Sequence, residues 1–276
     1  MIKKVRSILY YIILALLLII LVYPIFMIIS MSLKTSAEIQ TNSVFALPET
    51  FYIGNYIRAL EQSNLLVYYK NSLIVTSASV LMILCLSSMA AFAIAKMKFR
   101  GSEKILNLFL MGITIPTSIT LLPLFIIFRN MKLTNTHISL ILPMVGFALP
   151  MSIYLFVAFY AYIPDSLLES AIIDGATVTD VFLKLIVPLS KNTFLTVAMT
   201  NVIGIWNEFM FSNTFISDVE MKTLPVGLYD FVGFMGSVDW TATFAAISMS
   251  VMPILLVYFM LNKYITNGVI AGAVKG

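Results

Sequence analysis

The chain has 276 residues, of which 60% are hydrophobic and only 11% are charged. A soluble domain carries about 25% charged residues, so this chain lacks the polar side chains needed to cover a water-facing surface. The net charge of +4 comes from basic residues scattered between apolar segments, so it does not indicate nucleic-acid binding. The single cysteine excludes an internal disulfide, and together with the single histidine it argues against Cys/His metal sites and histidine-based catalytic triads.

The amino terminus is a basic stretch followed by a long apolar segment. The apolar run from Ile8 to Leu33 far exceeds the core of about 7–15 residues in a signal peptide. No small-residue cleavage site follows it. We therefore predict an uncleaved first membrane helix.

Five further segments reach the length of about 20 apolar residues that a helix needs to cross a bilayer. Their apolar residues are continuous and do not alternate with a period of two, which favours helices over a membrane barrel. No polar linker divides them, so we predict one all-α membrane domain, residues 1–276. The six predicted transmembrane helices are Ile8–Leu33, Ser72–Ala95, Ile105–Phe128, Ile138–Tyr160, Thr193–Ile216 and Thr241–Leu261.

The orientation of these spans follows from lysine and arginine, which favour cytoplasmic loops. The loops place eleven of these residues on the side of the two termini and six on the opposite side. We therefore predict a multi-pass protein in the lipid bilayer with both termini in the cytoplasm. The two external loops, 34–70 and 217–240, each fit either a membrane anchor or a docking surface for an outside partner.

A mixed-charge segment, about residues 162–191, separates the fourth and fifth spans on the cytoplasmic side. Pro164 suits the first turn of a helix, where its missing N–H costs nothing. Asp165 and Glu169 are favourable near the positive end of the same helix. Gly175 can adopt the left-handed conformation that ends many helices, so we predict a short helix that stops there.

A second short helix is predicted directly after this glycine. Thr177 followed by Asp180 is a capping-box pattern, and the helix runs through Val181–Val187 towards Pro188. The segment is thus a helix–turn–helix elbow. Isolated helices under about 12–15 residues are marginal in water. The apolar stripe of the first helix therefore fits either docking onto a partner or packing onto the protein's own bundle.

The spacing of residues in this elbow resembles the EAA signature of permease subunits of bacterial ABC importers. That signature reads E-A-A, two residues of which the second is small or apolar, D-G-A, and then an end of the form hydrophobic-x-hydrophobic-Pro. Ser170 stands where the family usually has alanine, which exchanges one small residue for another. The residues that carry the resemblance are Glu169, Ser170, Ala171, Asp174, Gly175, Ala176 and Pro188.

The resemblance extends over nearly the whole chain. It is similar to carbohydrate-uptake permeases of the maltose/oligosaccharide type, and it resembles the smaller, six-span partner of that permease pair. The implied fold is the type I ABC importer permease fold, with a cytoplasmic coupling helix. The further segments that carry the similarity are FALPETFYIGNYIRAL in the first external loop, WNEF at 206–209, KTLPVGLYDFVG at 222–233 and GVIAGAVKG at 268–276.

The resemblance implies a transport subunit of a bacterial inner membrane and not an enzyme. The helix Pro164–Ile173 would be the coupling helix in a groove of a cytoplasmic ATPase subunit, where Glu169 would contact or order the groove. Gly175 would allow the sharp turn, and Pro188 would close the second helix near the membrane. The tail, 268–276, would be a second contact with the ATPases or simply a disordered end.

The resemblance also implies a set of partners. These are a second permease in a heterodimer, two ATPase subunits that hold ATP and Mg²⁺, an extracellular solute-binding protein and a sugar as cargo. The chain contains no G-x-x-x-x-G-K-[ST] phosphate loop. We therefore expect no cofactor or metal site in this chain, and ATP must be bound by another subunit.

Polar residues of the fifth predicted span are candidates for the sugar path. A charge at the bilayer centre costs about 2.5–3.5 kcal/mol on insertion scales, so such charges usually face a cavity. The candidates are Asn201, Trp206, Asn207 and Glu208, with Trp206 as a stacking surface for a sugar ring. Asn201 and Glu208 are seven residues apart, which predicts a shared helical face. The alternative is that Glu208 caps or pairs with a neighbouring helix.

A self-contained secondary transporter or channel is the alternative function. Such transporters favour intramembrane acid pairs and inverted repeats. Glu208 is the only charged residue within the six predicted spans, and the sequence has no clear internal repeat. The importer subunit is therefore the leading hypothesis.

Overall fold

The computed structural model describes residues 2–231 and 238–273, and for residues 2–5, 8 and 261–273 it describes only the backbone. Two segments discussed above end outside the described residues. These are KTLPVGLYDFVG, at 232–233, and the tail, at 274–276.

Contacts between residues divide the chain into two compact units. Unit 1 consists of Met1–Leu66 and Gly227–Pro253, and unit 2 of Val67–Val226 and Ile254–Gly276. A single domain over residues 1–276 stays a prediction.

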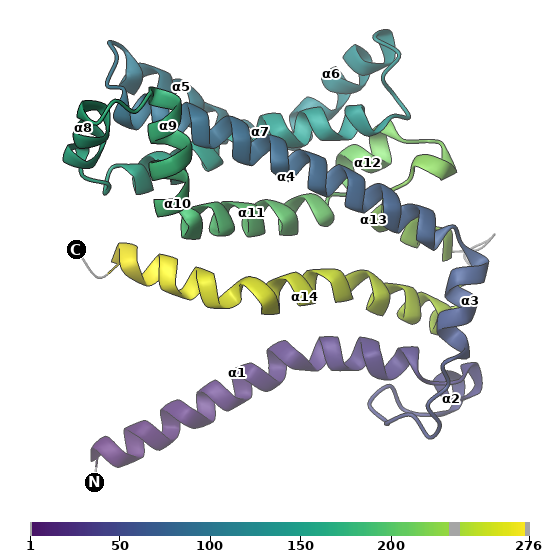
Figure 1. The fold of residues 1–276 in the computed structure, drawn as a ribbon. Helices are drawn as coiled ribbons and strands as arrows, with labels where there is room; N and C mark the ends of the chain where they lie inside the picture. Colours follow the sequence, from purple (N-terminus) through teal and green to yellow (C-terminus); the bar gives the residue numbers. More distant parts are fainter. Residues whose placement is uncertain (1, 232–237, 274–276) are drawn as a thin grey trace. The chain divides into compact units, whose positions relative to one another are not determined.

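Helices joined by short loops make up the described chain (Figure 1). Among the described residues, four helices are long and apolar enough to cross a membrane, and two bent helix pairs raise that number to six if each pair is one span. Six spans are thus consistent with helix length and composition. The helices are α1 (Ile2–Ser32), α2 (Ser36–Thr41), α3 (Gly54–Gln62), α4 (Leu65–Lys96), α5 (Ser102–Ile113), α6 (Thr117–Asn130), α7 (His137–Tyr160), α8 (Asp165–Ile173), α9 (Val178–Asp180), η1 (Val181–Ile186), α10 (Val187–Leu189), α11 (Lys191–Trp206), α12 (Met210–Phe215), η2 (Val219–Met221), α13 (Leu224–Gly227), η3 (Leu228–Phe231) and α14 (Trp240–Ala273).

The third predicted span, Ile105–Phe128, is a bent pair and not one helix. Helices α5 and α6 meet at 94° around Pro116, whose ring nitrogen has no hydrogen to donate. The Thr114 hydroxyl donates to the Met111 carbonyl at 2.7 Å, which satisfies an acceptor at the broken end of α5. The prediction of a continuous helix here is wrong, although the proline signals the break.

The fifth predicted span, Thr193–Ile216, is also interrupted. Helix α11 ends at Trp206 and α12 follows after a three-residue break. The break is stabilised because the Glu208 carboxylate accepts hydrogen bonds from two of the first backbone N–H groups of α12. The prediction of one helix over this range is therefore wrong.

In unit 1, polar side chains hold the end of α1 against α3 and the start of α14. The Asn55 amide donates to the backbone carbonyls of Ser32 at 2.8 Å and of Lys34 at 2.7 Å. Arg58 donates to the Thr241 hydroxyl at 2.6 Å. The two Asn55 bonds satisfy backbone acceptors at the end of α1 and just after it.

In unit 2, aromatic side chains join α7 to α11 and α4 to the second arm of the elbow. Ile153 and Phe156 of α7 are almost fully buried, and the Phe156 ring lies 4.7 Å from that of Phe194 on α11. The Phe92 ring of α4 lies 5.3 Å from that of Phe182 in η1. The second arm of the elbow is thus packed directly against a membrane-length helix.

Candidate coupling elbow and membrane cavity

Helix α8, the first arm of the elbow, begins at Asp165, one residue later than the predicted helix Pro164–Ile173, and Pro164 occupies the position directly before it. Leu168 is buried, and Ala171, one turn later, packs against the core of unit 2. Leu167 and Ile172 belong to the same predicted stripe, yet both are exposed. Only a narrow face of α8 therefore packs on its own bundle, and the rest of its apolar surface stays open.

The outward surface of α8 combines a carboxylate with apolar groups. Glu169 and Ser170 are exposed, and Ile173 is 84% exposed. Within the described chain, the Glu169 carboxylate takes part in no hydrogen bond or ion pair. A large apolar side chain as exposed as Ile173, next to an exposed carboxylate, is the kind of surface that a partner covers.

Gly175 ends α8 in the left-handed conformation, with a φ of +88°. Its N–H donates to the Ile172 carbonyl at 3.0 Å, and the Ala176 N–H donates to the Ala171 carbonyl at 2.9 Å. These two bonds form a Schellman motif, and the N–H of Asp174 completes the turn by donating to the Ser170 carbonyl at 3.0 Å. A Cβ at position 175 would meet no atom within 4 Å, so conformation and not space requires the glycine.

The second arm begins with the predicted capping box. The Asp180 N–H donates to the Thr177 hydroxyl oxygen, and the Thr177 N–H donates to the Asp180 carboxylate, both at 3.2 Å. Lys184 lies one turn further on, with its Nζ 2.5 Å from Asp180 Oδ1. Hydrogen bonds from Lys184, and then from Thr177, lower the pKa of Asp180 to about 2. The Asp180 carboxylate at the start of this arm is therefore ionised at neutral pH.

The second arm widens into a π-helix before Pro188. In η1 the backbone bonds span five residues, as in the Val187 N–H that donates to the Phe182 carbonyl. An ordinary α-turn would place the Pro188 ring against the Lys184 carbonyl, and proline has no N–H to bond it. The wider turn relieves that conflict. Two residues later, at Ser190, the chain bends by 75° into α11.

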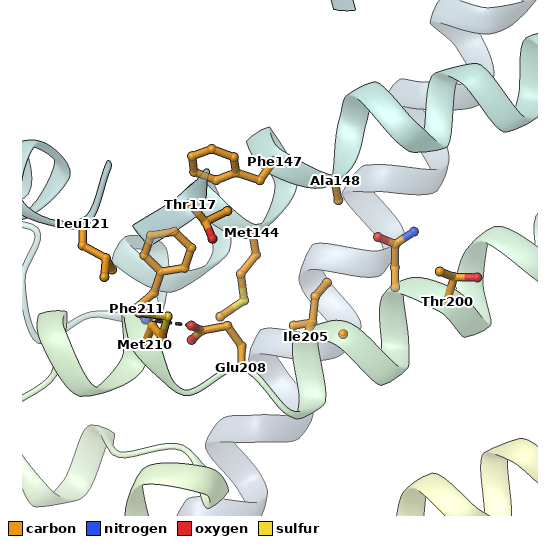
Figure 2. A pocket seen from close by; sticks show the side chains of 12 residues that line it. Thr117, Leu121, Met144, Phe147, Ala148, Thr200, Ile205, Glu208, Met210 and Phe211 are labelled. Carbon is orange, nitrogen blue, oxygen red and sulfur yellow. Dashed lines mark hydrogen bonds between the residues drawn. The ribbon is translucent and has the colours of Figure 1, made fainter. Parts of the chain in front are cut away.

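A cavity of about 320 Å³ lies in unit 2 between α6, α7, α11 and the start of α12 (Figure 2). Asn201 and Glu208 both line it, although they do not share one helix. Trp206 is buried, with its ring 6.2 Å from that of Tyr69, and Asn207 is exposed; neither lines the cavity. The structure therefore brings together two of the four candidates for the sugar path.

Glu208 serves as a helix cap at the edge of this cavity. Its Oε1 accepts from the Phe211 N–H at 2.7 Å, a bond drawn in Figure 2. Its Oε2 accepts from the N–H and the hydroxyl of Ser212, both at 3.1 Å. The alternative interpretation, that Glu208 caps a helix, is thus confirmed, and the capped helix is the next one in its own chain.

Asn201 is held by its amide nitrogen. Nδ2 donates to the Ser152 hydroxyl at 3.2 Å and to the Val197 carbonyl at 2.8 Å. Its Oδ1 accepts no hydrogen bond from the part of the chain that the structure describes, so it can receive one from a ligand hydroxyl. The remaining lining residues come from several helices and share no local pattern, so the sequence did not predict them. They are Thr117, Leu121, Met144, Phe147, Ala148, Thr200, Gly204, Ile205, Met210 and Phe211.

Comparison with known proteins places the chain in a family. The family described as binding-protein-dependent transport system inner membrane component matches residues 83–271, more than half of the chain. The chain belongs to this family of transport permeases. The permease is 37% identical to a putative ABC transporter permease protein of Caldicellulosiruptor sp. (strain Rt8B.4), over 97% of this chain and 96% of that protein.

Two further relatives of the permease are named for sugar uptake. A trehalose/maltose transport system permease protein of Thermococcus litoralis is 33% identical, over 81% of each chain. A diacetylchitobiose uptake system permease protein of Streptomyces coelicolor is 31% identical, over 93% of this chain and 85% of that protein.

The fold of the permease is that of a known ABC importer subunit. It superposes on a chain of a bacterial ABC transporter involved in the import of the acidic polysaccharide alginate, with a TM-score of 0.85 and 24% identity. The match covers 95% of this permease and 97% of that chain. The expected ABC importer permease fold is therefore confirmed.

Proposed function

We propose that this chain is the smaller permease subunit of an ATP-driven importer for a sugar or oligosaccharide in a bacterial inner membrane. It would form half of the transport path with a second permease, beside two ATPase subunits and an extracellular solute-binding protein. The names of its relatives, which include permeases for diacetylchitobiose and for trehalose/maltose, support a sugar as cargo. The same relatives favour an importer over a self-contained secondary transporter or channel.

The observation that carries this proposal is the two-sided elbow. The inner face of α8 is fixed on the bundle through Leu168, while Glu169 and Ile173 are exposed on its outer face. We propose that this outward face docks into an ATPase subunit, which holds the ATP and Mg²⁺. Closure of the two ATPases would then move the elbow and switch the permease pair between inward-open and outward-open states.

The sugar path is proposed to include the cavity beside α11. Asn201 offers a free amide oxygen, and the aromatic rings of Phe147 and Phe211 offer apolar faces of the kind that pack on sugar rings. Glu208 has three donors already and would act mainly by holding α12 at the edge of the path. Direct contact with the sugar is therefore assigned chiefly to Asn201.

Transport by the complete complex in proteoliposomes tests the proposal. With binding protein outside and ATP inside, labelled maltose, trehalose or diacetylchitobiose should accumulate, and a non-hydrolysable ATP analogue should abolish uptake. Brisk uptake of the sugar by this chain alone, with no nucleotide, would refute the importer assignment and favour a self-contained transporter.

Two matched pairs of variants test the residue roles in that assay. Glu169→Gln should separate ATP hydrolysis from uptake, whereas Thr179→Ala, at an exposed position on the second arm, should not. Asn201→Leu should reduce sugar uptake roughly ten-fold through loss of one buried polar contact, while Asn192→Leu, exposed on the same helix, should have no effect. Normal uptake in Glu169→Gln or Asn201→Leu would contradict the corresponding role.

A further inference from the structure

A lysine at the end of α4 contacts the first turn of α8. Lys96 is the last residue of α4, and its side chain is only 3% exposed. Its Nζ donates to Asp165 Oδ1 at 2.8 Å and to the Ile163 carbonyl at 2.5 Å. The partners of this ammonium therefore all lie at the junction between α7 and the elbow.

The acceptor in this contact is shared with a second lysine. Lys98, in the turn after α4, donates to the other carboxylate oxygen of Asp165. Lys98 itself is largely exposed, so its ion pair is screened by water. Hydrogen bonds from Lys96, and then from Lys98, lower the pKa of Asp165 to about 2. The carboxylate is therefore charged at every physiological pH, and Lys96 is its buried partner.

The same end of α4 also holds the second arm of the elbow. Phe92 lies one helical turn before Lys96, and it is this ring that packs at 5.3 Å from Phe182 in η1. The final turn of α4 thus contacts α8 through an ion pair and η1 through an aromatic contact. Figure 1 shows α8 near the turn that joins α4 to α5, in agreement with the ion pair between Lys98 and Asp165.

The two kinds of contact differ in how they respond to movement. Apolar contacts such as that of Leu168 are non-directional and let helices slide. A buried ammonium is costly to leave without its partners, because the lost hydration is not replaced. If α8 moves, the end of α4 must therefore follow Asp165 or leave a buried charge unpaired.

We propose that the Lys96–Asp165 ion pair links α8 to α4, and that it carries movement of the coupling helix into the membrane-spanning part of the permease. Lys96 is a positioning residue in this scheme, since it acts through α8 and touches neither nucleotide nor cargo. The inference rests on the proposed docking of α8 to an ATPase subunit.

The test compares single and double variants in the assembled complex, reconstituted with binding protein and a transported sugar such as maltose. Asp165→Leu leaves the Lys96 ammonium buried beside an apolar group, so it should lower the unfolding temperature. Lys96→Met combined with Asp165→Leu removes both charges and should restore that temperature. The amount of sugar imported per ATP hydrolysed should nevertheless be roughly five-fold lower in the double variant than in the unaltered complex.

Controls come from neighbouring residues. Lys104→Met and Glu103→Gln remove exposed charges from the first turn of α5. Both variants should leave the amount of sugar imported per ATP unchanged. Lys96→Arg keeps the positive charge and should retain most of the coupling.

A double variant with normal stability and a normal amount of sugar imported per ATP would overturn the proposal, because the pair would then be purely structural. Failure of the unaltered complex to import sugar with ATP would instead refute the proposed function, and this inference with it.

Discussion

Replacing Gly175 by alanine tests the geometry of the elbow most directly. The residue has a φ of +88°, where an L-residue with a Cβ is disfavoured by about 1–2 kcal/mol. Because a Cβ would meet no atom within 4 Å, the whole cost is conformational and no steric clash contributes. A loss of this size lowers the ratio of folded to open turn about five- to thirty-fold.

Hydrogen exchange at the Ala176 amide reports this loss, because that N–H closes the Schellman motif by bonding the Ala171 carbonyl. In Gly175→Ala we expect exchange to speed up by roughly the same five- to thirty-fold factor. Sugar imported per ATP hydrolysed should fall in parallel. Gly175→Asn should change both less, since asparagine tolerates the left-handed region.

Gly101 provides a control with the same backbone problem at another place. It lies in the turn before α5 with a φ of +98°, and a Cβ added there would also meet no atom within 4 Å. Gly101→Ala should therefore suffer a similar local strain but leave exchange at Ala176 unchanged. Equal exchange in Gly175→Ala and the unaltered chain would refute the reasoning, as would an identical effect of Gly175→Asn.

Two further outcomes follow from the carboxylates. Glu208→Ala should destabilise the solubilised complex by about 1 kcal/mol through loss of the α12 cap, and Glu208→Gln should have an intermediate effect. Unfolding midpoints measure this loss, and an unchanged midpoint in Glu208→Ala would contradict the capping role. The pKa of Asp165 is lowered from 3.8 to about 2, so its ion pairs stabilise the folded state above about pH 4 and are lost as the pH falls towards 2. The difference in unfolding midpoint between the unaltered chain and Asp165→Asn should therefore be constant from pH 5 to 7 and shrink below pH 4, and a difference that grows on acidification would show that the sign is wrong.

The parts of the elbow that the sequence predicts are those that local rules decide. Gly175 stops α8, and Thr177 with Asp180 starts the second arm, because each device involves residues fewer than six positions apart. The direction in which α8 buries its stripe was not predictable, since Leu168 and Leu167 are chemically alike. Only tertiary packing determines which of the two is covered.

The interruption after Trp206 shows why some boundaries escape pattern analysis. No proline marks it, and the polar residues that follow Trp206 are mixed with large apolar ones as far as Ile216, so the pattern still fits a membrane span. The Glu208 side chain instead starts the next helix, because it accepts hydrogen bonds from N–H groups three and four residues ahead. The Lys96–Asp165 pair escapes for another reason, because 69 residues separate its partners and no local spacing records it.

The hydrogen bonds of the Schellman turn and of the capping box lie almost entirely within the elbow itself, between residues at most five positions apart. The turn and the cap of the elbow are thus determined by its own sequence. Lys96, which lies outside the elbow, joins it to α4 through the ion pair with Asp165. We therefore expect that the elbow can be exchanged between related permeases. The receiving protein must supply a lysine at the position of Lys96 and an apolar surface that buries Leu168. If α8 docks onto an ATPase subunit as proposed, a change of cargo elsewhere in the permease need not alter that contact.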